Sequence, residues 1–230
     1  MTNIKIQIIS DSVCPWCYIG YRRLTRAIKT HLHSNPTDTF SLHWRAFYLN
    51  PNAAPYPGVN KAEMYASKFG AERCKAIFAR LQDAGQAEGF EFSFNGNTGS
   101  TRDSHRLIWF AGQQTENTSP ETEGGDGDGK SVQTKVVENL FKAYFEDEKN
   151  ITDKEVLIEA GVLAGLERGE VAKVLDEGIG AEEVDAEAFT ASRRLVSGVP
   201  NFTIQGKYLI EGADEPETFL EVFERVKLDE

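Results

Sequence analysis

The sequence predicts an α/β protein whose strands lie near the two ends of the chain and whose middle is helical. Three observations support this fold class. Apolar residues alternate with polar ones near both termini, they recur at helical spacing through the middle, and proline and glycine mark boundaries near residues 50 and 198. With 230 residues, 40% of them hydrophobic, the chain is long enough to bury a substantial core.

The first fifty residues are predicted to run strand, helix, strand. Ile4, Ile6 and Ile8 alternate with polar residues ahead of a Ser-Asp-Ser turn, which is the period-two pattern of a strand. A helix from about residue 14 to 31 should follow, because its apolar residues recur at helical spacing. Alternation returns over residues 39–47 and predicts a second strand.

The middle of the chain shows only helical patterns. After a proline-rich loop the pattern is helical from about 60 to 89, and further helices are expected over residues 102–114, 131–146, 153–164, 170–177 and 181–197. Residues 116–129 interrupt them with an acidic, glycine-rich segment that has no basic residue. Such a composition buries too little apolar surface to become ordered, so we expect a mobile loop there, or alternatively a partner-binding element.

After Pro200 the sequence again shows the pattern typical of strands. Residues 201–204 and 207–210 flank a Gln-Gly turn, which predicts a hairpin. Residues 215–228 carry the apolar stripe of a final helix. The two ends together supply strand-helix-strand and strand-strand-helix.

Charge and hydropathy exclude several function classes. The chain has 25 basic and 36 acidic residues, a net charge of −11, which argues against a nucleic-acid partner. No window approaches the roughly 20 apolar residues that a membrane-spanning helix needs. The N-terminus lacks the unbroken apolar stretch of a secretory signal, so we expect a soluble, cytoplasmic protein. Three cysteines are too few for a disulfide framework, which favours catalytic cysteine chemistry.

The segment Cys14-Pro15-Trp16-Cys17 carries the strongest chemical signal. A Cys-x-x-Cys directly after a strand and at the start of a helix is typical of thioredoxin-like redox motifs. Helix N-terminal amides stabilise a thiolate, so Cys14 is the predicted nucleophile, and Pro15 suits the first helical turn. Cys17 lies one turn further on and is the predicted resolving residue, which attacks the mixed disulfide formed at Cys14.

A zinc site is the alternative interpretation of the same four residues. Zinc normally requires four ligands, and no second matching pair is present. Cys74 stands alone in a predicted helix, and His31 and His33 lie at the far end of the first helix, about 20 Å or more from Cys14 by helical rise. We therefore expect no metal.

Val199-Pro200 precedes the predicted hairpin. A proline immediately before a short strand cannot donate a hydrogen bond to a neighbouring strand and so fits ordinary strand pairing poorly. A cis peptide bond before the proline would explain its presence there. A plain trans proline that starts the strand is the alternative.

These features together resemble the DsbA-like branch of the thioredoxin superfamily, especially the cytosolic FrnE-like group. That group is related to 2-hydroxychromene-2-carboxylate isomerases and kappa-class glutathione transferases. The resemblance spans nearly the whole chain and is carried by five landmarks in order: Asp11-Ser12-Val13-Cys14-Pro15-Trp16-Cys17-Tyr18-Ile19-Gly20, Trp44-Arg45-Ala46-Phe47-Tyr48-Leu49-Asn50-Pro51, Ser104-His105-Arg106-Leu107, Leu140-Phe141-Lys142-Ala143-Tyr144-Phe145 and Ser197-Gly198-Val199-Pro200.

The resemblance implies a thioredoxin-like domain of residues 1–50 and 198–230 with a helical domain, residues 51–197, inserted and packed over the redox site. It also implies that Pro200 is cis and that the backbone of Val199 pairs with a peptide or thiol ligand.

Trp16, Tyr18 and His105 would then lie near the cleft, together with Pro15. For His105 the alternative is a polar residue satisfied on a helix face. Asp214 occupies a place where glutathione-using relatives hold the γ-glutamyl amine, so it is a candidate glutathione contact. Its alternative is a solvated turn residue that caps the last helix.

The leading functional hypothesis is an enzyme that exchanges disulfides between Cys14, Cys17 and a protein or small thiol. No cofactor is required, although glutathione is a candidate co-substrate, and the protein is expected to act as a monomer or homodimer. In a cytoplasm poised by glutathione the reducing or isomerising direction is favoured. A glutathione-dependent isomerase or transferase is the alternative, and a non-catalytic binding module is a third class.

Overall fold

A computed structural model describes residues 1–116, 130–193 and 198–229. Its centre is a four-stranded mixed sheet with strand order β2-β1-β5-β6. The strands are β1 (Asn3–Ser10), β2 (Thr39–Ala46), β5 (Asn201–Ile204) and β6 (Tyr208–Glu211). β1 runs parallel to β2 and antiparallel to β5, with Ile6 opposite Ile204, and β5 and β6 form the predicted hairpin. The two ends of the chain therefore build one sheet, as the alternating patterns predicted.

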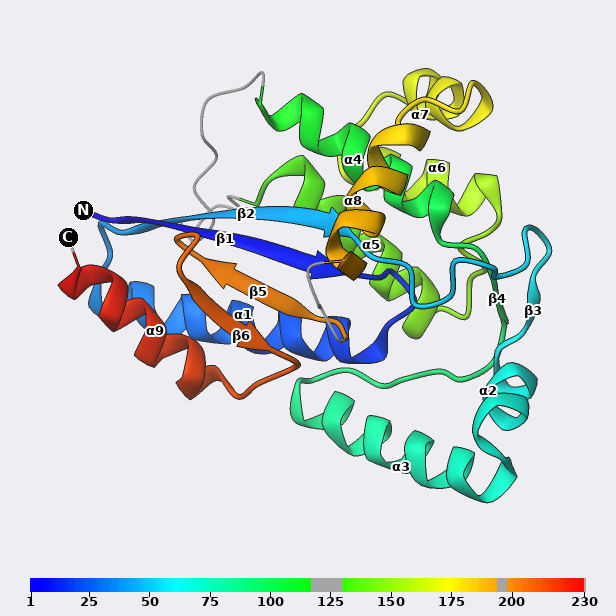
Figure 1. Ribbon diagram of the computed structural model, residues 1–230, viewed down its shortest axis with the longest axis horizontal. Coiled ribbons are helices and arrows are strands. Elements are labelled where there is room, and N and C mark those ends of the chain that lie inside the picture. Colours follow the sequence, from blue (N-terminus) through cyan, green and yellow to red (C-terminus); the bar gives the residue numbers. More distant parts are fainter. Residues whose placement is uncertain (117–129, 194–197, 230) are drawn as a thin grey trace.

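Two helices from the terminal segments cover the same face of this sheet. They are α1 (Pro15–Ser34) and α9 (Pro216–Leu228), which lie side by side below the strands in Figure 1. Ile4, Ile6 and Ile8 of the central strand are fully buried, which explains their alternation with polar residues. The termini lie together at the end of the sheet opposite the start of α1 (Figure 1).

The middle of the chain divides into two parts. A bundle packs on the β2 side of the sheet and contains α4 (Arg102–Glu116), α5 (Val132–Phe145), α6 (Lys154–Leu163), α7 (Arg168–Asp176) and α8 (Ala181–Arg193). A separate hairpin of α2 (Lys61–Phe69) and α3 (Ala71–Ala87) lies below the bundle, close to the first turn of α1 (Figure 1).

The helical segment predicted over residues 60–89 thus consists of two helices rather than one continuous run. The chain turns at Gly70, whose φ of 82° lies in the left-handed region that favours glycine. Two short strands, β3 (Val59–Asn60) and β4 (Asn97–Thr98), pair around the hairpin and were not predicted. The predicted loop over 116–129 and the end of the helix over 181–197 fall largely outside the described residues.

Side chains cover the outer edge of β2 at its C-terminal end, at Trp44 and Ala46. The Gln133 amide accepts a hydrogen bond from Trp44 N at 3.0 Å and donates one to Trp44 O at 3.3 Å. Ala46 N donates to the Glu187 carboxylate at 3.0 Å. Backbone groups that would otherwise lack a partner at a sheet edge are therefore satisfied by α5 and α8.

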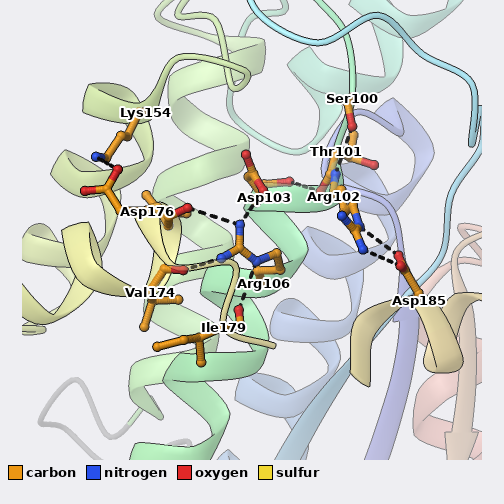
Figure 2. Close-up of polar contacts among 12 residues, drawn as sticks. Ser100, Thr101, Arg102, Asp103, Arg106, Lys154, Val174, Asp176, Ile179 and Asp185 are labelled. Atoms are coloured by element: carbon orange, nitrogen blue, oxygen red, sulfur yellow. Dashed lines mark hydrogen bonds and ion pairs between the residues drawn. The ribbon is translucent and has the colours of Figure 1, made fainter. Parts of the chain in front are cut away.

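Arg106, part of the Ser-His-Arg-Leu landmark, has a structural role that Figure 2 shows. Its buried guanidinium donates to carbonyl oxygens at the C-terminal end of α7, those of Val174 and Leu175, and to Ile179 O at 2.9 Å. Asp103 pairs with it at 2.6 Å. Helix C-terminal carbonyls lack partners within their own helix, so Arg106 ties α7 to α4 by satisfying them.

Candidate redox site

Cys14 lies where the chain passes from β1 into α1. It is the N-cap residue of α1, with φ −87° and ψ 112°, and Pro15 occupies the first helical turn. Cys14 N donates to Asp11 O at 3.0 Å, and Cys17 N donates to Cys14 O at 3.0 Å. The turn after β1 therefore fixes the first thiol at the positive end of a 20-residue helix.

The cis-proline loop lies directly against this thiol. The Cys14 thiol donates to Val199 O at 3.5 Å, and the Val199-Pro200 peptide bond is cis, as the resemblance implied. Gly20 permits the approach, since a Cβ at this position would lie 2.9 Å from Pro200 Cγ and 3.3 Å from Phe202 Cζ. Residues 185 positions apart thus meet at the redox motif.

Cys17 sits behind Cys14 and is only 1% exposed. Burial raises the pKa of the Cys17 thiol, and the neighbouring Cys14 thiol raises it further. A hydrogen bond from the Ser10 hydroxyl and another from the Asp11 backbone act in the opposite direction. Both Cys14 and Cys17 are free thiols in this structure. Burial thus keeps the Cys17 thiol shielded from solvent and favours its protonated form.

A cleft of about 1060 Å³ opens beside Cys14. One wall consists of the redox motif and the cis-proline loop, with Cys14, Pro15, Trp16 and Val199. The opposite wall is the α2–α3 hairpin, and its apolar lining side chains are Met64, Tyr65, Phe69, Ile77 and Leu81. The sequence showed these residues as apolar positions of helices, but a helical stripe does not reveal which surface it faces. The second wall was therefore missed.

Tyr18 lies behind the motif and does not line this cleft. Its hydroxyl donates to Glu146 at 2.6 Å, and its ring packs on Phe90 and Phe141 with centroids 4.3 and 5.1 Å away. Burial raises the pKa of the Tyr18 hydroxyl, and the Glu146 carboxylate adds to this effect. Tyr18 thus anchors the start of α1 to the end of α5.

His105 is likewise buried behind the cleft, at 3% exposure. Its Nε2 lies 3.1 Å from Phe47 O and 3.4 Å from Asp11 Oδ1. Asp11 itself lines the cleft, and its other carboxylate oxygen accepts from Leu49 N at 2.8 Å. His105 is therefore satisfied on its helix face and reaches the cleft through its contacts with the lining residues Asp11 and Thr101, to whose backbone oxygen His105 N donates at 3.0 Å. Neither was among the predicted site residues.

Asp214 is exposed in the loop between β6 and α9. Its carboxylate accepts from Glu215 N at 3.1 Å, and Glu215 is the N-cap residue of α9. Of the described residues that line the cleft, none comes from this loop.

Two further observations concern the described residues as a whole. In these segments no three or more His, Cys, Asp or Glu side chains gather where they could hold a metal ion. None of the helices in the described ranges is both long and apolar enough to cross a membrane.

A thioredoxin-like sheet with a Cys-x-x-Cys at the start of its first helix and a cis-proline loop against it defines the class of thioredoxin-like redox proteins. The chain belongs to the family of the DSBA-like thioredoxin domain, whose model matches residues 5–224. No curated protein sequence matches the chain.

Solved structures agree with this family. The "probable DsbA oxidoreductase" of Streptomyces coelicolor is similar, with 27% identity, a TM-score of 0.82 and coverage of 99% of this chain and 91% of the other. 2-Hydroxychromene-2-carboxylate isomerase shares the fold at 15% identity and a TM-score of 0.60, covering 96% and 95%. The cytosolic disulfide reductase DsbM of Pseudomonas aeruginosa, solved with GSH, shares it at 17% identity and a TM-score of 0.51, covering 98% and 100%.

Proposed function

We propose that this protein is a thiol-disulfide oxidoreductase that uses Cys14 and Cys17 as its redox pair. One observation carries the proposal: Cys14 lines an open cleft at the N-terminus of α1, with Val199 O against its sulfur and Cys17 buried directly behind it. A reactive cysteine requires an environment that favours the thiolate and access for a partner sulfur. Cys14 lies at a helix N-terminus and, although only 4% exposed, lines the cleft, whereas Cys17 does not line it and burial raises the pKa of its thiol.

The reaction consists of two displacements at sulfur. The Cys14 thiolate attacks one sulfur of a substrate disulfide, forms a mixed disulfide and releases the other substrate sulfur as a thiolate, which takes up a proton. Cys17 then loses its proton and attacks the Cys14 sulfur. The second substrate thiolate leaves, and the Cys14-Cys17 disulfide forms as the substrate gains two electrons. Two molecules of a small thiol, with glutathione as the candidate, return the pair to its reduced form.

The shape of the cleft favours a polypeptide as the substrate. Its volume of about 1060 Å³ is at the upper end of the range for small-molecule pockets, and its second wall is apolar. The likeness to a cytosolic disulfide reductase supports the reducing direction in a cytoplasm poised by glutathione.

A glutathione-dependent isomerase or transferase is the second candidate. This candidate is considered because 2-hydroxychromene-2-carboxylate isomerase shares the fold. Asp214, the expected contact for the glutathione amine, is exposed and lies outside the cleft wall, which weakens this candidate. A non-catalytic binding module would keep its function after both redox cysteines are replaced.

The deciding experiment combines a redox titration with cysteine variants. Thiol-trapping mass spectrometry across a glutathione series is expected to show a reversible Cys14-Cys17 disulfide. Cys14→Ser should reduce turnover of a protein disulfide to the uncatalysed rate, whereas Cys17→Ser should accumulate the mixed disulfide. Cys74→Ser is the matched control, since this third cysteine is buried in α3, and it should retain turnover. Unchanged activity in Cys14→Ser would refute the proposal.

A further inference from the structure

The α2–α3 hairpin places three cations over aromatic rings beside the cleft. The Arg80 guanidinium lies 5.0 Å from the centre of the Trp16 ring. Lys68 Nζ lies 5.4 Å from the centre of the Phe69 ring, and the Arg73 guanidinium lies 6.0 Å from the same ring. Both Trp16 and Phe69 line the cleft, as does Lys68 itself. The cations are thus at the rim of the redox cleft.

The spacing along α3 puts two of these cations on the side of the helix that forms the cleft wall. Arg73, Ile77 and Arg80 are separated by four and three residues, so their side chains are neighbours on one helical face. Ile77 lines the cleft. Arg73 and Arg80 therefore flank the apolar wall.

The charges of these cations are available to a partner. All three side chains are exposed, and none forms an ion pair with a carboxylate in the described parts of the chain. A guanidinium stacked on a ring keeps its N–H donors in the plane of the group, where they can still reach a carboxylate.

The rim contrasts with the rest of the protein. The chain carries a net charge of −11, yet Lys68, Arg73 and Arg80 lie exposed on or beside the cleft wall. The exposed carboxylates of the hairpin are Glu63, which lines the cleft, Glu72 and Asp83, and Glu72 is already paired with Lys75 at 2.9 Å. Asp11 also lines the cleft but is buried at 1% exposure. Charge complementarity at an interface sets partner choice and association rate. Unpaired cations beside the cleft of an acidic protein therefore favour anionic partners there.

We propose that the α2–α3 hairpin selects polypeptide substrates that place apolar side chains in the cleft and acidic side chains next to the reacting cysteine. This inference rests on the proposed function, because the reacting sulfur is taken to be the partner of Cys14. Apolar side chains meet Met64, Phe69 and Ile77, while flanking carboxylates meet Lys68, Arg73 and Arg80. A free small anion would contact the rim without filling the apolar wall.

The test compares short peptides that each carry one cysteine between apolar residues, linked through a disulfide to neutral 2-thiopyridine. The flanking positions hold Glu, Gln or Lys, and release of thiopyridone reports kcat/KM. For the unchanged protein the order Glu, then Gln, then Lys is expected. Arg80→Gln should lower the Glu-to-Gln ratio of kcat/KM about threefold, and the triple variant Lys68→Gln/Arg73→Gln/Arg80→Gln about tenfold. High salt should reduce the preference in the unchanged protein.

Lys75→Gln is the matched control, because Lys75 is an exposed cation of α3 that pairs with Glu72 at 2.9 Å. It should leave the ratio unchanged. Equal losses for the Glu and Gln peptides in Arg80→Gln, or no preference in the unchanged protein, would overturn the inference. A charge preference seen with oxidised glutathione but not with the peptides would also overturn it, since the anion would then be a small molecule.

A binding measurement separates this inference from the proposed function. The Cys14→Ser/Cys17→Ser variant should bind the corresponding Glu peptide, with serine in place of cysteine, more tightly than the Gln peptide in calorimetry. If Cys14→Ser keeps full exchange activity, the proposed function fails whatever the peptide preference. If Cys14→Ser is inactive and the binding preference is absent, only the selection by the hairpin fails.

Discussion

The two walls of the cleft are held in different ways. The wall with Cys14 is part of the central sheet and α1. It is packed so closely on the cis-proline loop that a Cβ at Gly20 would clash with Pro200. The opposite wall, the α2–α3 hairpin, packs mainly against itself and is fastened at its two ends. The proposed redox pair thus lies where positions are fixed from many sides, and the proposed substrate-selecting surface lies on an element fixed mainly at its two ends.

The first fastening is Lys61 at the start of α2. Its ammonium is buried, donates to Tyr144 O at 2.7 Å and to Ser93 O at 3.4 Å, and lies 3.9 Å from the centre of the Tyr144 ring. Burial lowers the pKa of Lys61 to about 8, and the Glu148 carboxylate partly opposes this shift. A single cation thus joins the hairpin to the end of α5.

The second fastening is Glu88, directly after α3. Its buried carboxylate pairs with Arg23 at 3.1 Å and with Arg26 at 3.3 Å, both on α1. Arg23 also donates to Ala213 O at 2.6 Å in the loop after β6. This cluster connects the hairpin, α1 and the C-terminal segment.

Removing Glu88 should have the largest effect, because it frees one end of the hairpin wall. Glu88→Ala removes the carboxylate that Arg23 and Arg26 share. Arg23 keeps Glu215 at 2.7 Å and Arg26 is half exposed, so the loss should be about 2 kcal/mol, the range for hydrogen bonds to charged groups. Chemical denaturation should show this loss in the free energy of unfolding, and limited proteolysis should cut first between residues 61 and 88. Glu72→Ala removes an exposed carboxylate of the same helix and should cost less than about 0.5 kcal/mol. Equal losses in the two variants would contradict the role of Glu88.

Gly20→Ala tests the wall that carries Cys14. An alanine inside an open helix is about 1 kcal/mol more stable than glycine, so a gain would be expected if the site were unconstrained. The Cβ would instead meet Pro200 Cγ at 2.9 Å, and overpacking of this kind costs about 2 kcal/mol. We expect a net loss in thermal unfolding and a lower kcat/KM, because the cis-proline loop must move relative to Cys14. A stabilised variant would show that the loop is not held by this contact.

Lys61→Met tests the attachment of the hairpin through the pH dependence of stability. The pKa of Lys61 is about 8 in the folded protein and lies below the ordinary value of 10.5, so the unfolded chain binds more protons between these limits. The buried ammonium of Lys61 therefore lowers the free energy of unfolding at neutral pH. That free energy should rise as the pH rises through this window, by roughly 1 kcal/mol per pH unit. The difference in unfolding free energy between the unchanged protein and Lys61→Met should show this slope between pH 8 and 10.5. A flat difference would mean that Lys61 is not buried as a cation.

Tyr18→Phe should have the smallest effect. It removes the hydrogen bond to Glu146 and keeps the ring on Phe90, so about 1 kcal/mol of stability should be lost. Turnover of a protein disulfide should fall far less than in Gly20→Ala, because Tyr18 lies behind the cleft wall. A loss of turnover as large as that of Gly20→Ala would place Tyr18 in the reaction.

The sequence revealed the sheet and the redox motif because both depend on local patterns. Alternation at Ile4, Ile6 and Ile8 follows directly from burial of a central strand. The turn at Gly70 was not predicted, since good helix formers surround it and a single glycine does not by itself end a helical pattern. The pairing of β3 with β4 depends on tertiary contacts between segments about 38 residues apart and leaves no local signal.

The candidate site was only half predictable for the same reason. Cys14, Trp16 and Val199 were found through their motif and the resemblance, and all three line the cleft. Which face of a helix lines a cleft is decided by packing, so the hairpin wall could not be found. His105 was expected near the cleft, but its contacts with Phe47 O and Asp11 place it one layer behind.

The covered end of the β2 edge bears on how this protein behaves at high concentration. Sheet proteins aggregate most readily when an outer strand offers free N–H and C=O groups to another copy. Gln133 and Glu187 already engage Trp44 and Ala46 on that strand, so a second chain would have to displace both side chains before it could add there. Pairing of another copy with the Trp44–Ala46 end of β2 is thereby discouraged.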